Sequence, residues 1–382
     1  MASSSLARTL VPAVLRATLR SRPIPDEVAD QSVDTFLSAY FGAEFARTFG
    51  SALVHGIYAA DSRQLSVRAA FPSLWDASIR GKGNIVRGIV QNALRPSNNL
   101  DDKTYEMGNM MDKMKGVSVY SFQDGMETIT RALRQDLEKR HNVEIIAGDA
   151  AASLRRDASD TTFKIDTVTG RRIDASHVVS AISLKALNNI VPPSIPITST
   201  TSQNSTSSVT VVNIVFPPTS FPIHPPGFGY LVPRPRSNAL DAELEDHAGT
   251  LGVVFDSCAL PQQDLYANAA SPRFTKVTMM LGGPHAFPHN AESVSEDKLL
   301  GILSRHLAPS QPLPKPVLIR VHHLTGCIPT PTVGHLQRIA AVKNDLKKSE
   351  FWRGNLEIVG AGVGGVSVPD CIEQGRHVGL NW

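Results

Sequence analysis

The sequence predicts a mixed architecture of the α/β and α+β type, built from pieces that are not contiguous along the chain. The first third has the periodicity of helices, whereas the later part contains short alternating segments typical of strands. A length of 382 residues exceeds one ordinary core and predicts two or three domains. With 42% hydrophobic and 19% charged residues, the composition is that of a globular protein.

The helical part extends over residues 25–95. Its apolar residues recur three and four positions apart, as in Val33, Phe36, Leu37, Tyr40 and Phe41. The polar segment that follows, residues 96–118, has no clear period and is predicted to be a mobile loop. We interpret its methionines as gap-fillers, although they could also cover a hydrophobic ligand.

The first 25 residues contain four arginines, several serines and no acidic residue before Asp26. This composition is typical of a mitochondrial transit peptide, but it also fits an ordinary amphipathic helix. No run of 18 apolar residues occurs, so the sequence predicts no transmembrane helix. Any contact with a membrane would then be monotopic.

A second set of elements is predicted after the loop. A helix beginning at Gly125 leads into a strand over Val143–Ile146, and a later helix covers about Ser295–Leu307. Further strands are predicted at Thr162–Val168, Arg172–Ala181, Ser208–Phe216, Leu251–Phe255, Lys276–Leu281 and Val317–Val321. The Pro/Ser/Thr-rich residues 192–207 mark a domain boundary or an exposed crossover.

The charge balance and the cysteines exclude several classes of function. A net charge of +3 without a long basic run gives no indication of nucleic-acid binding. The three cysteines are widely separated, so we expect neither a disulfide framework nor a zinc site, and we interpret them as buried apolar residues. His322 and His323 are adjacent in a predicted strand and would point to opposite faces, which disfavours a shared metal.

A glycine-rich segment, Gly360–Gly365, follows an apolar strand near the carboxyl terminus. Only 17 residues follow Gly365, which is too few for a complete dinucleotide-binding unit. The segment instead predicts a strand, a tight turn and a helix, with Ser367 as N-cap, Pro369 in the first turn and Asp370 at the positive end of the dipole. Such a helix start would stabilise a reduced flavin, or the turn would serve packing alone.

These residues resemble the carboxyl-terminal signature of the FAD-dependent protoporphyrinogen oxidase family, mitochondrial type, within the flavin amine oxidase superfamily. Seven further segments resemble that family in the same order: LVHGIYAADSRQLSVRAAFPSL, GMETITRALRQDL, HVVSAIS, GFGYLVP, LGVVFDS, TMMLGG and CIPTPTVGH. The resemblance covers nearly the whole chain.

The resemblance implies an FAD-linked reductase type of fold. Its parts would be a helical membrane-binding domain over 1–118, part of an FAD-binding domain over 119–195, a mixed-sheet substrate domain over 196–323, and the carboxyl-terminal part of the FAD-binding domain over 324–382. It also implies a location at the inner mitochondrial membrane and allows a homodimer.

The implied activity is the oxidation of protoporphyrinogen IX to protoporphyrin IX in heme biosynthesis, with FAD as hydride acceptor and dioxygen as reoxidant. By resemblance, the flavin contacts are Ala151, Gly360, Ala361, Val366, Ser367 and Val368. The substrate contacts are Phe228, Gly229, Leu231, Val254 and Met280. Without the resemblance, ordinary core packing would be the favoured interpretation of these five. No general base and no metal are expected.

The sequence also departs from the family pattern. The amino-terminal strand, GxGxxG turn and helix of the family do not precede Met1, so we expect an incomplete FAD domain with exposed apolar faces, and residues 1–25 to be a helix. The alternatives are therefore a truncated active oxidase or a non-catalytic remnant that binds porphyrin or a membrane. A flavin amine oxidase is a more distant alternative, because its usual aromatic residues are absent between Trp352 and Trp382.

Overall fold

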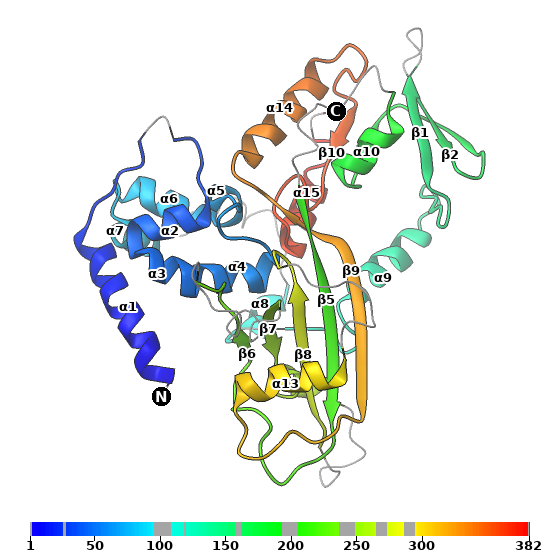
Figure 1. Cartoon of the computed structure of the whole chain (residues 1–382). Coiled ribbons are helices and arrows are strands. Elements are labelled where there is room, and N and C mark those ends of the chain that lie inside the picture. Colours follow the sequence, from blue (N-terminus) through cyan, green and yellow to red (C-terminus); the bar gives the residue numbers. More distant parts are fainter. Residues whose placement is uncertain are drawn as a thin grey trace.

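The computed structural model describes residues 2–25, 28–94, 108–117, 120–156, 162–192, 205–236, 249–264, 273–285, 295–380 and 382. Three regions are visible in Figure 1: a group of helices, a long antiparallel sheet, and a smaller mixed region that contains the carboxyl terminus. The predicted mixed α/β architecture is confirmed.

The amino-terminal helices form one packed module. They are α1 (Ala2–Leu19), α2 (Val33–Phe41), α3 (Ala43–Phe45), α4 (Ser51–Tyr58), α5 (Val67–Ala70), α6 (Pro72–Arg80) and α7 (Ile85–Ala93), with a π-helical turn at Ala46–Gly50. Phe36, Trp75 and Ile85 lie in the core of the module. The side chains of Ser32, Ser66 and Asn84 cap α2, α5 and α7. The helical prediction for residues 25–95 is confirmed for the described part.

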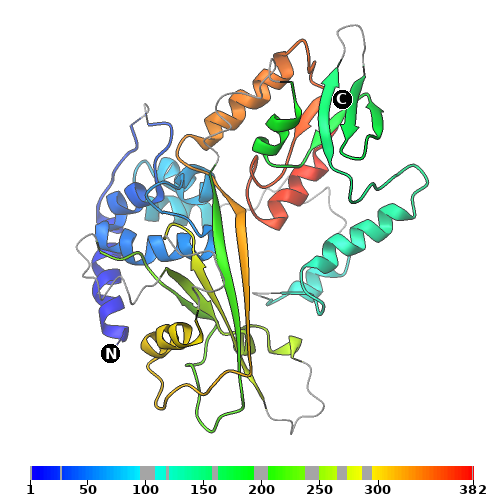
Figure 2. The same cartoon turned by 45° about the vertical axis from the view of Figure 1, so that its right-hand side comes forward.

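A five-stranded antiparallel sheet has the order β6-β7-β8-β5-β9. Its strands are β5 (Ser205–Phe216), β6 (Gly229–Leu231), β7 (Thr250–Val254), β8 (Thr275–Gly282) and β9 (Leu318–Thr330). Figure 2 shows β5 and β9 side by side along most of their length. Two short helices, α12 (Asp256–Ala259) and a 3₁₀ turn at Pro261–Gln263, follow β7.

The two faces of this sheet differ. On one face, Val212, Ile214, Met279 and Leu281 pack with Leu303 of α13 (Glu296–Leu307), forming a closed core. The opposite face, which we call the open face, is covered at one end by α4, where Ala59 packs with Val209 and Leu251. Val211 and Met280 pack against this cluster, and Leu231 lies against Gly56 of α4.

The third region surrounds the carboxyl terminus. Strands β4 (Val178–Ser180) and β10 (Leu356–Ile358) are paired in parallel, and β1 (Ala151–Arg156), β2 (Phe163–Thr167) and β3 (Arg172–Ala175) form an antiparallel sheet. Helices α10 (Leu184–Ile190), α14 (His335–Lys348) and α15 (Val368–Arg376) complete the region. Val179 in β4 and Ile182 just after it are 41% and 48% exposed.

Residues 143–146 are not a strand, so that prediction was wrong. A strand requires hydrogen bonds to a neighbouring strand, and the described residues provide none there. Val143 instead donates to the carbonyl of Arg140 in a turn. The preceding helix is confirmed as α9 (Glu127–Glu138), but its apolar stripe is not buried, since Leu133 and Leu137 are 57% and 40% exposed.

Other sequence predictions are corrected in detail. The expected strand at Arg172–Ala181 is split into β3 and β4, and the strand expected at Val317–Val321 is the first part of the longer β9, which ends at Thr330. Cys258 and Cys327 are exposed and Cys371 is half-buried, so the cysteines are not core residues. They lie in a short surface helix, at the end of an edge strand and on the exposed helix α15.

Two predicted segments lie largely outside the described residues. Of the loop at 96–118, the described part contains the short helix α8 (Met110–Met114). Of the Pro/Ser/Thr-rich stretch at 192–207, Ser205 to Ser207 begin β5.

Candidate flavin and substrate site

The glycine-rich segment forms a strand, a turn and a helix, as predicted. Ser367 is the N-cap of α15, and its hydroxyl accepts a hydrogen bond from the backbone N–H of Asp370. The Asp370 carboxylate in return accepts from the Ser367 N–H at 3.0 Å, which completes a capping box. Pro369 lies in the first turn, where its missing N–H costs no hydrogen bond.

The glycines of this turn serve two different purposes. A Cβ at Gly364 would lie 2.4 Å from the side chain of Gln374, and one at Gly365 would lie 2.1 Å from the Asp370 carboxylate. These two glycines therefore allow the turn to pack closely on α15. A Cβ at Gly362 would meet nothing within 4 Å. Part of the turn therefore packs, and part leaves the backbone open.

A cleft of about 680 Å³ lies beside the open part of the turn. Its walls come from the loop after β4, the start of β5, the end of β9 and the glycine turn, and they include Ile182, Ser183, Thr206, Cys327, Ala361 and Gly362. Small side chains and backbone dominate these walls, while Lys185, Asn188 and Asn189 contribute polar groups. A flat heteroaromatic ring with a polar edge suits such a lining.

The residues present fit the ring end of a flavin. Gly362, where a Cβ would meet nothing within 4 Å, and the small Ala361 line the cleft, and α15 begins a few residues after them at Val368. When bound, a flavin supplies a two-electron hydride acceptor, which no side chain of the protein offers. The part of the chain that surrounds the cleft would hold and orient that ring.

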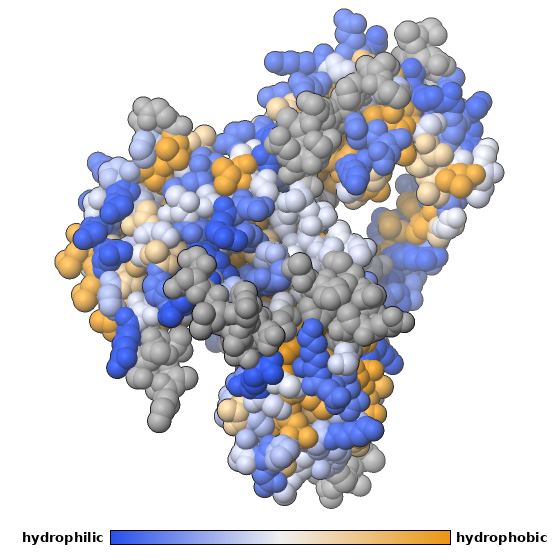
Figure 3. Space-filling model, viewed as in Figure 1, coloured by the Kyte–Doolittle hydropathy of each residue, from blue (hydrophilic) through white to orange (hydrophobic). Residues whose placement is uncertain are grey.

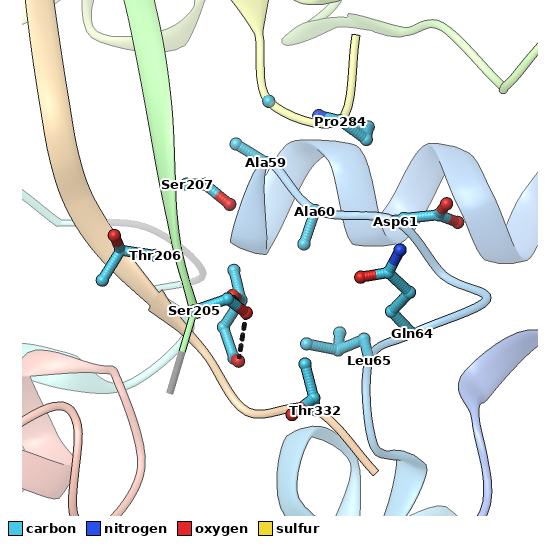
Figure 4. Close-up of a pocket in the computed structure, with 12 residues that line it drawn as sticks. Ala59, Ala60, Asp61, Gln64, Leu65, Ser205, Thr206, Ser207, Pro284 and Thr332 are labelled. Carbon is cyan, nitrogen blue, oxygen red and sulfur yellow. Dashed lines mark hydrogen bonds between the residues drawn. The ribbon is translucent and has the colours of Figure 1, made fainter. Parts of the chain in front are cut away.

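A smaller cavity of about 190 Å³ adjoins the cleft and shares Ser205 and Thr206 with it. Figure 4 shows Gln64 directed into this cavity, opposite the start of β5. The hydroxyls of Ser205 and Thr330 are 2.6 Å apart. The sequence analysis missed these residues, because isolated Ser, Thr and Gln carry no recognisable motif.

A third cavity, of about 420 Å³, shares Asp61 and Pro284 with the second. It is lined by Arg47, Arg63, Arg234 and Arg236, three of which pair with Glu44 or Asp61. Burial lowers the pKa of His285, which also lines this cavity. The three cavities are thus neighbours that share wall residues, and the arginine-rich one was also missed by the sequence analysis.

Helix α15 is fixed against the helical module. Val366, just before the helix, packs on the core of that module. Burial raises the pKa of Tyr58 on α4, and the nearby Asp370 carboxylate raises it further. The helical module therefore forms one side of the region between α15 and the sheet.

The predicted flavin residues are only partly brought together. Ala361 lines the cleft, Gly360 adopts a φ of 109° at the entry to the turn, and Ser367 caps α15. Val366 is directed into the helical core, whereas Val368 is 49% exposed at the helix start. Ala151 lies at the start of β1, paired with Thr167, and is not among the residues of the cleft.

The predicted substrate residues share one face of the sheet. Leu231 is paired with Gly252, and Gly252 with Met280, while Gly229 is paired with Val254 in the neighbouring row. Residues directly opposite in an antiparallel pair project to the same side, so these side chains lie on the open face in two adjacent rows. Phe228 directly precedes β6 and is 58% exposed.

The open face also carries a polar group of residues that sequence reasoning missed. Thr278 donates to the Asp256 carboxylate at 2.7 Å and accepts from Asn213 at 2.8 Å. Burial raises the pKa of Asp256, while the hydrogen bond from Thr278 lowers it. These residues continue the row of Gly229 and Val254 toward β5.

Comparison with known proteins now identifies the family. The family model described as "Flavin containing amine oxidoreductase" matches residues 2–378. The chain belongs to this family. A protoporphyrinogen oxidase of Homo sapiens is 30% identical to this family member over 358 residues, which cover 92% of the chain and 69% of that relative. A protoporphyrinogen oxidase of Schizosaccharomyces pombe is 30% identical over 366 residues, which cover 91% of the chain and 67% of that relative.

Solved structures support the same fold for this family member. A protein from Exiguobacterium sp. 255-15, provisionally named a protoporphyrinogen oxidase, superposes with a TM-score of 0.66 at 19% identity, covering 98% of the chain and 70% of that structure. A reduced UDP-galactopyranose mutase gives a TM-score of 0.58 at 13% identity, covering 94% of the chain and 68% of that structure. The predicted resemblance is confirmed, and the chain is an oxidoreductase of the flavin-containing class.

Proposed function

We propose that this oxidoreductase converts protoporphyrinogen IX to protoporphyrin IX, with FAD as its flavin and dioxygen as the final oxidant, in heme biosynthesis. The observation that carries the proposal is the grouping of Gly229, Leu231, Val254 and Met280 in two rows of the open face. The nearer row reaches β5 at Val211 and the second at Asn213, about 13 Å and about 20 Å along the strand from Ser207, which lines the smaller cavity beside the flavin cleft. The identity to named protoporphyrinogen oxidases supports it.

The open face suits a large, flat and mainly apolar ligand. Met280 and Val254 are half-buried, Leu231 is 42% exposed, and Gly229 offers no side chain. Gly229 adopts a φ of 150°, and a Cβ there would lie 2.2 Å from the carbonyl of Val253. The packing of β6 on β7 therefore requires a glycine at this point, and a glycine leaves no side chain between the backbone and a macrocycle on the open face.

The division of roles follows from this arrangement. The apolar rows would bind and orient the porphyrinogen and exclude water from one side of it. The glycine turn and α15 would hold the flavin ring, whose chemistry is hydride acceptance. No side chain of the described residues is assigned as a general base.

The proposal is tested by incubating the purified full-length chain, supplied with FAD, with protoporphyrinogen IX in air. The fluorescence of protoporphyrin reports product formation. We expect formation above the spontaneous rate, and we expect Met280→Glu to abolish the excess, because a carboxylate would lie within an apolar row. Met126→Glu, at an exposed methionine outside the face, is the matched control. Equal rates with and without the chain would contradict the proposal.

We further propose a monotopic contact with the inner mitochondrial membrane. Within the part of the chain that the structure describes, no helix is long and apolar enough to cross a bilayer. However, α1 exposes a stripe of Val11, Val14, Leu15 and Leu19, and the contacting helix α7 exposes Ile89 and Val90, followed by the exposed C-cap residue Leu94. Figure 3 shows apolar side chains at the outer edge of this module. The arginines of the first 25 residues would favour anionic lipid. The homodimer stays a prediction.

A further inference from the structure

The arginine-rich cavity of about 420 Å³ is distinct from the flavin cleft, and the described residues that line the two are all different. Its walls come from α4 and the residues on either side of that helix, from the segment after β6, and from the turn after β8. The volume lies within the range of small-molecule sites. Four guanidinium groups from three segments of the chain line it: Arg47, Arg63, Arg234 and Arg236.

These arginines outnumber the carboxylates around them. Three of the four have a carboxylate partner at 2.5 to 2.7 Å, and these pairs are Arg47 with Glu44, Arg63 with Asp61, and Arg234 with Asp34. Arg236 reaches only the Glu44 carboxylate, which Arg47 already holds, at 3.7 Å, and its side chain is 61% exposed. Four guanidiniums therefore meet three carboxylates, so this group of residues carries one positive charge in excess. A hollow with excess charge of one sign attracts ions of the opposite sign.

The ion pairs leave hydrogen-bond donors for a further anion. Arg63 holds Asp61 through Nε and one Nη, and its other Nη makes no hydrogen bond within the described part of the chain. Among the described residues, the guanidinium of Arg234 donates through Nη1 alone, to Asp34 and Ser62. Because a guanidinium carries five N–H groups, both arginines retain donors for a ligand without giving up their carboxylate partners.

The backbone that carries these arginines is fixed by hydrogen bonds. The N–H of Arg234 donates to the Ser51 hydroxyl at 2.8 Å, and Arg47 donates to the carbonyl of Arg234 at 3.1 Å. His55 Nδ1 lies 2.7 Å from the carbonyl of Val232. These bonds attach the segment after β6 to α4 and to the turn before it. The arginines are therefore positioned before a ligand binds, which lowers the entropic cost of binding.

A second observation, independent of the arginines, also points to a ligand. His285 lines the cavity, and its Nε2 atom is buried without a hydrogen-bond partner among the described residues. Its ring packs edge to face on His55, with the centroids 5.2 Å apart. Burial lowers the pKa of His285, so the ring is neutral near pH 7. A buried polar atom without a partner costs free energy, which a hydrogen bond to a ligand recovers.

We propose that this cavity binds a phosphate group, either as the free ion or as the phosphomonoester of a small molecule or of a lipid headgroup. A phosphate spreads about two negative charges over three oxygens, so it accepts hydrogen bonds from guanidiniums that approach from different directions. Arg63, Arg234 and Arg236 supply the donors and the positive charge, and His285 Nε2 bonds to one oxygen. The ligand would join the helical module to the sheet. This site goes beyond the proposed oxidation and does not depend on it.

The test is a calorimetric titration of the full-length chain with inorganic phosphate, at an ionic strength held constant with sodium chloride. We expect saturable binding of one phosphate per chain. Arg236→Gln is expected to weaken binding about tenfold, because it removes the excess charge and leaves the three close ion pairs in place. His285→Phe keeps an aromatic ring against His55 but removes Nε2, and it should weaken binding several-fold.

The matched control is Arg131→Gln, which removes the same charge from an exposed position on α9, outside the cavity. This variant should bind phosphate as the wild-type chain does. Absence of saturable binding, or equal weakening by Arg236→Gln and Arg131→Gln, would overturn the proposal. None of these measurements requires flavin or porphyrinogen, so their outcome is separate from that of the proposed oxidation.

Two further titrations identify the source of the phosphate. Binding of glycerol 3-phosphate that is tighter than that of inorganic phosphate and is weakened by Arg236→Gln indicates a small phosphomonoester. Sedimentation with phosphatidic acid vesicles that Arg236→Gln reduces, and Arg131→Gln does not, indicates a lipid headgroup. If inorganic phosphate alone shows dependence on Arg236, the ligand is the free ion.

Discussion

The hydroxyl of Ser367 donates to the carboxylate of Asp370 at 2.6 Å, and the backbone N–H of Asp370 donates back to that hydroxyl at 3.2 Å. This reciprocal bond fixes where α15 begins, directly after the glycine turn that borders the flavin cleft. The same two residues therefore cap the helix and determine where it begins beside the candidate cofactor site.

Removing the cap should weaken both stability and flavin binding. Ser367→Ala leaves the Asp370 N–H without its acceptor, and we expect a loss of about 1 kcal/mol in the free energy of unfolding. We also expect weaker FAD binding, measured by flavin fluorescence, because the helix start frays. Ser295→Ala removes the equivalent cap of α13 and serves as the control. It should lower stability to a similar degree without changing FAD affinity, and an equal loss of affinity would refute the link.

The glycines of the turn should not be equivalent. Gly365→Ala places a methyl group against the Asp370 carboxylate and is expected to destabilise the chain by about 1–3 kcal/mol. Gly362→Ala adds a methyl group in open space and should leave the unfolding midpoint nearly unchanged. Its effect should instead appear as reduced flavin affinity. Denaturant unfolding and flavin titration of both variants separate the two roles, and identical stability losses would contradict this assignment.

Stability should fall in mild acid because of His335. Burial, reinforced by the nearby Arg338, lowers the pKa of His335 to about 4, while Asp30 opposes the shift. Below the unfolded pKa of about 6.5, the unfolded chain binds a proton that the folded chain does not, so folding is penalised as the pH falls toward 4.

Between pH 7 and pH 5, this effect amounts to about 2 kcal/mol, since one pKa unit corresponds to about 1.4 kcal/mol. Urea unfolding at the two pH values measures it. His335→Gln, which carries no titratable proton, should show a smaller difference between the two conditions. An unchanged pH dependence in that variant would assign the effect to other groups.

The exposed stripe of α1 should control membrane contact. Val14→Glu places a charge at the centre of that stripe and is expected to reduce sedimentation with anionic vesicles several-fold. Leu133→Glu changes an equally exposed apolar residue on α9, outside the helical module, and is the control. If both variants bind vesicles as strongly as the wild-type chain, the proposed membrane face is wrong.

Much of this architecture follows from local sequence signals. Ser367 and Pro369 identify the start of α15, and the alternation in β5 and β8 identifies strands, because caps and periodicity depend on neighbouring residues. The prediction of a strand at Val143–Ile146 was wrong for the opposite reason. A strand needs hydrogen bonds to a neighbouring strand, and local sequence does not show whether such a neighbour is present.

The candidate site shows the same division. The resemblance selected Gly229, Val254 and Met280, which the register then placed on one face. It did not select Gln64 or Asn213, whose places in the smaller cavity and on the open face follow only from strand order and helix packing. Side chains that are brought together by topology have no signature along the chain.

The central claim is that a porphyrinogen on the open face delivers electrons to a flavin in the adjoining cleft. It is tested most directly by loading the full-length chain with FAD, removing oxygen, and adding protoporphyrinogen IX while the flavin absorption is recorded. The account predicts that the oxidised flavin band bleaches and returns when air is admitted, with protoporphyrin formed. An FAD-loaded chain whose flavin band stays unchanged in the presence of protoporphyrinogen IX would contradict it.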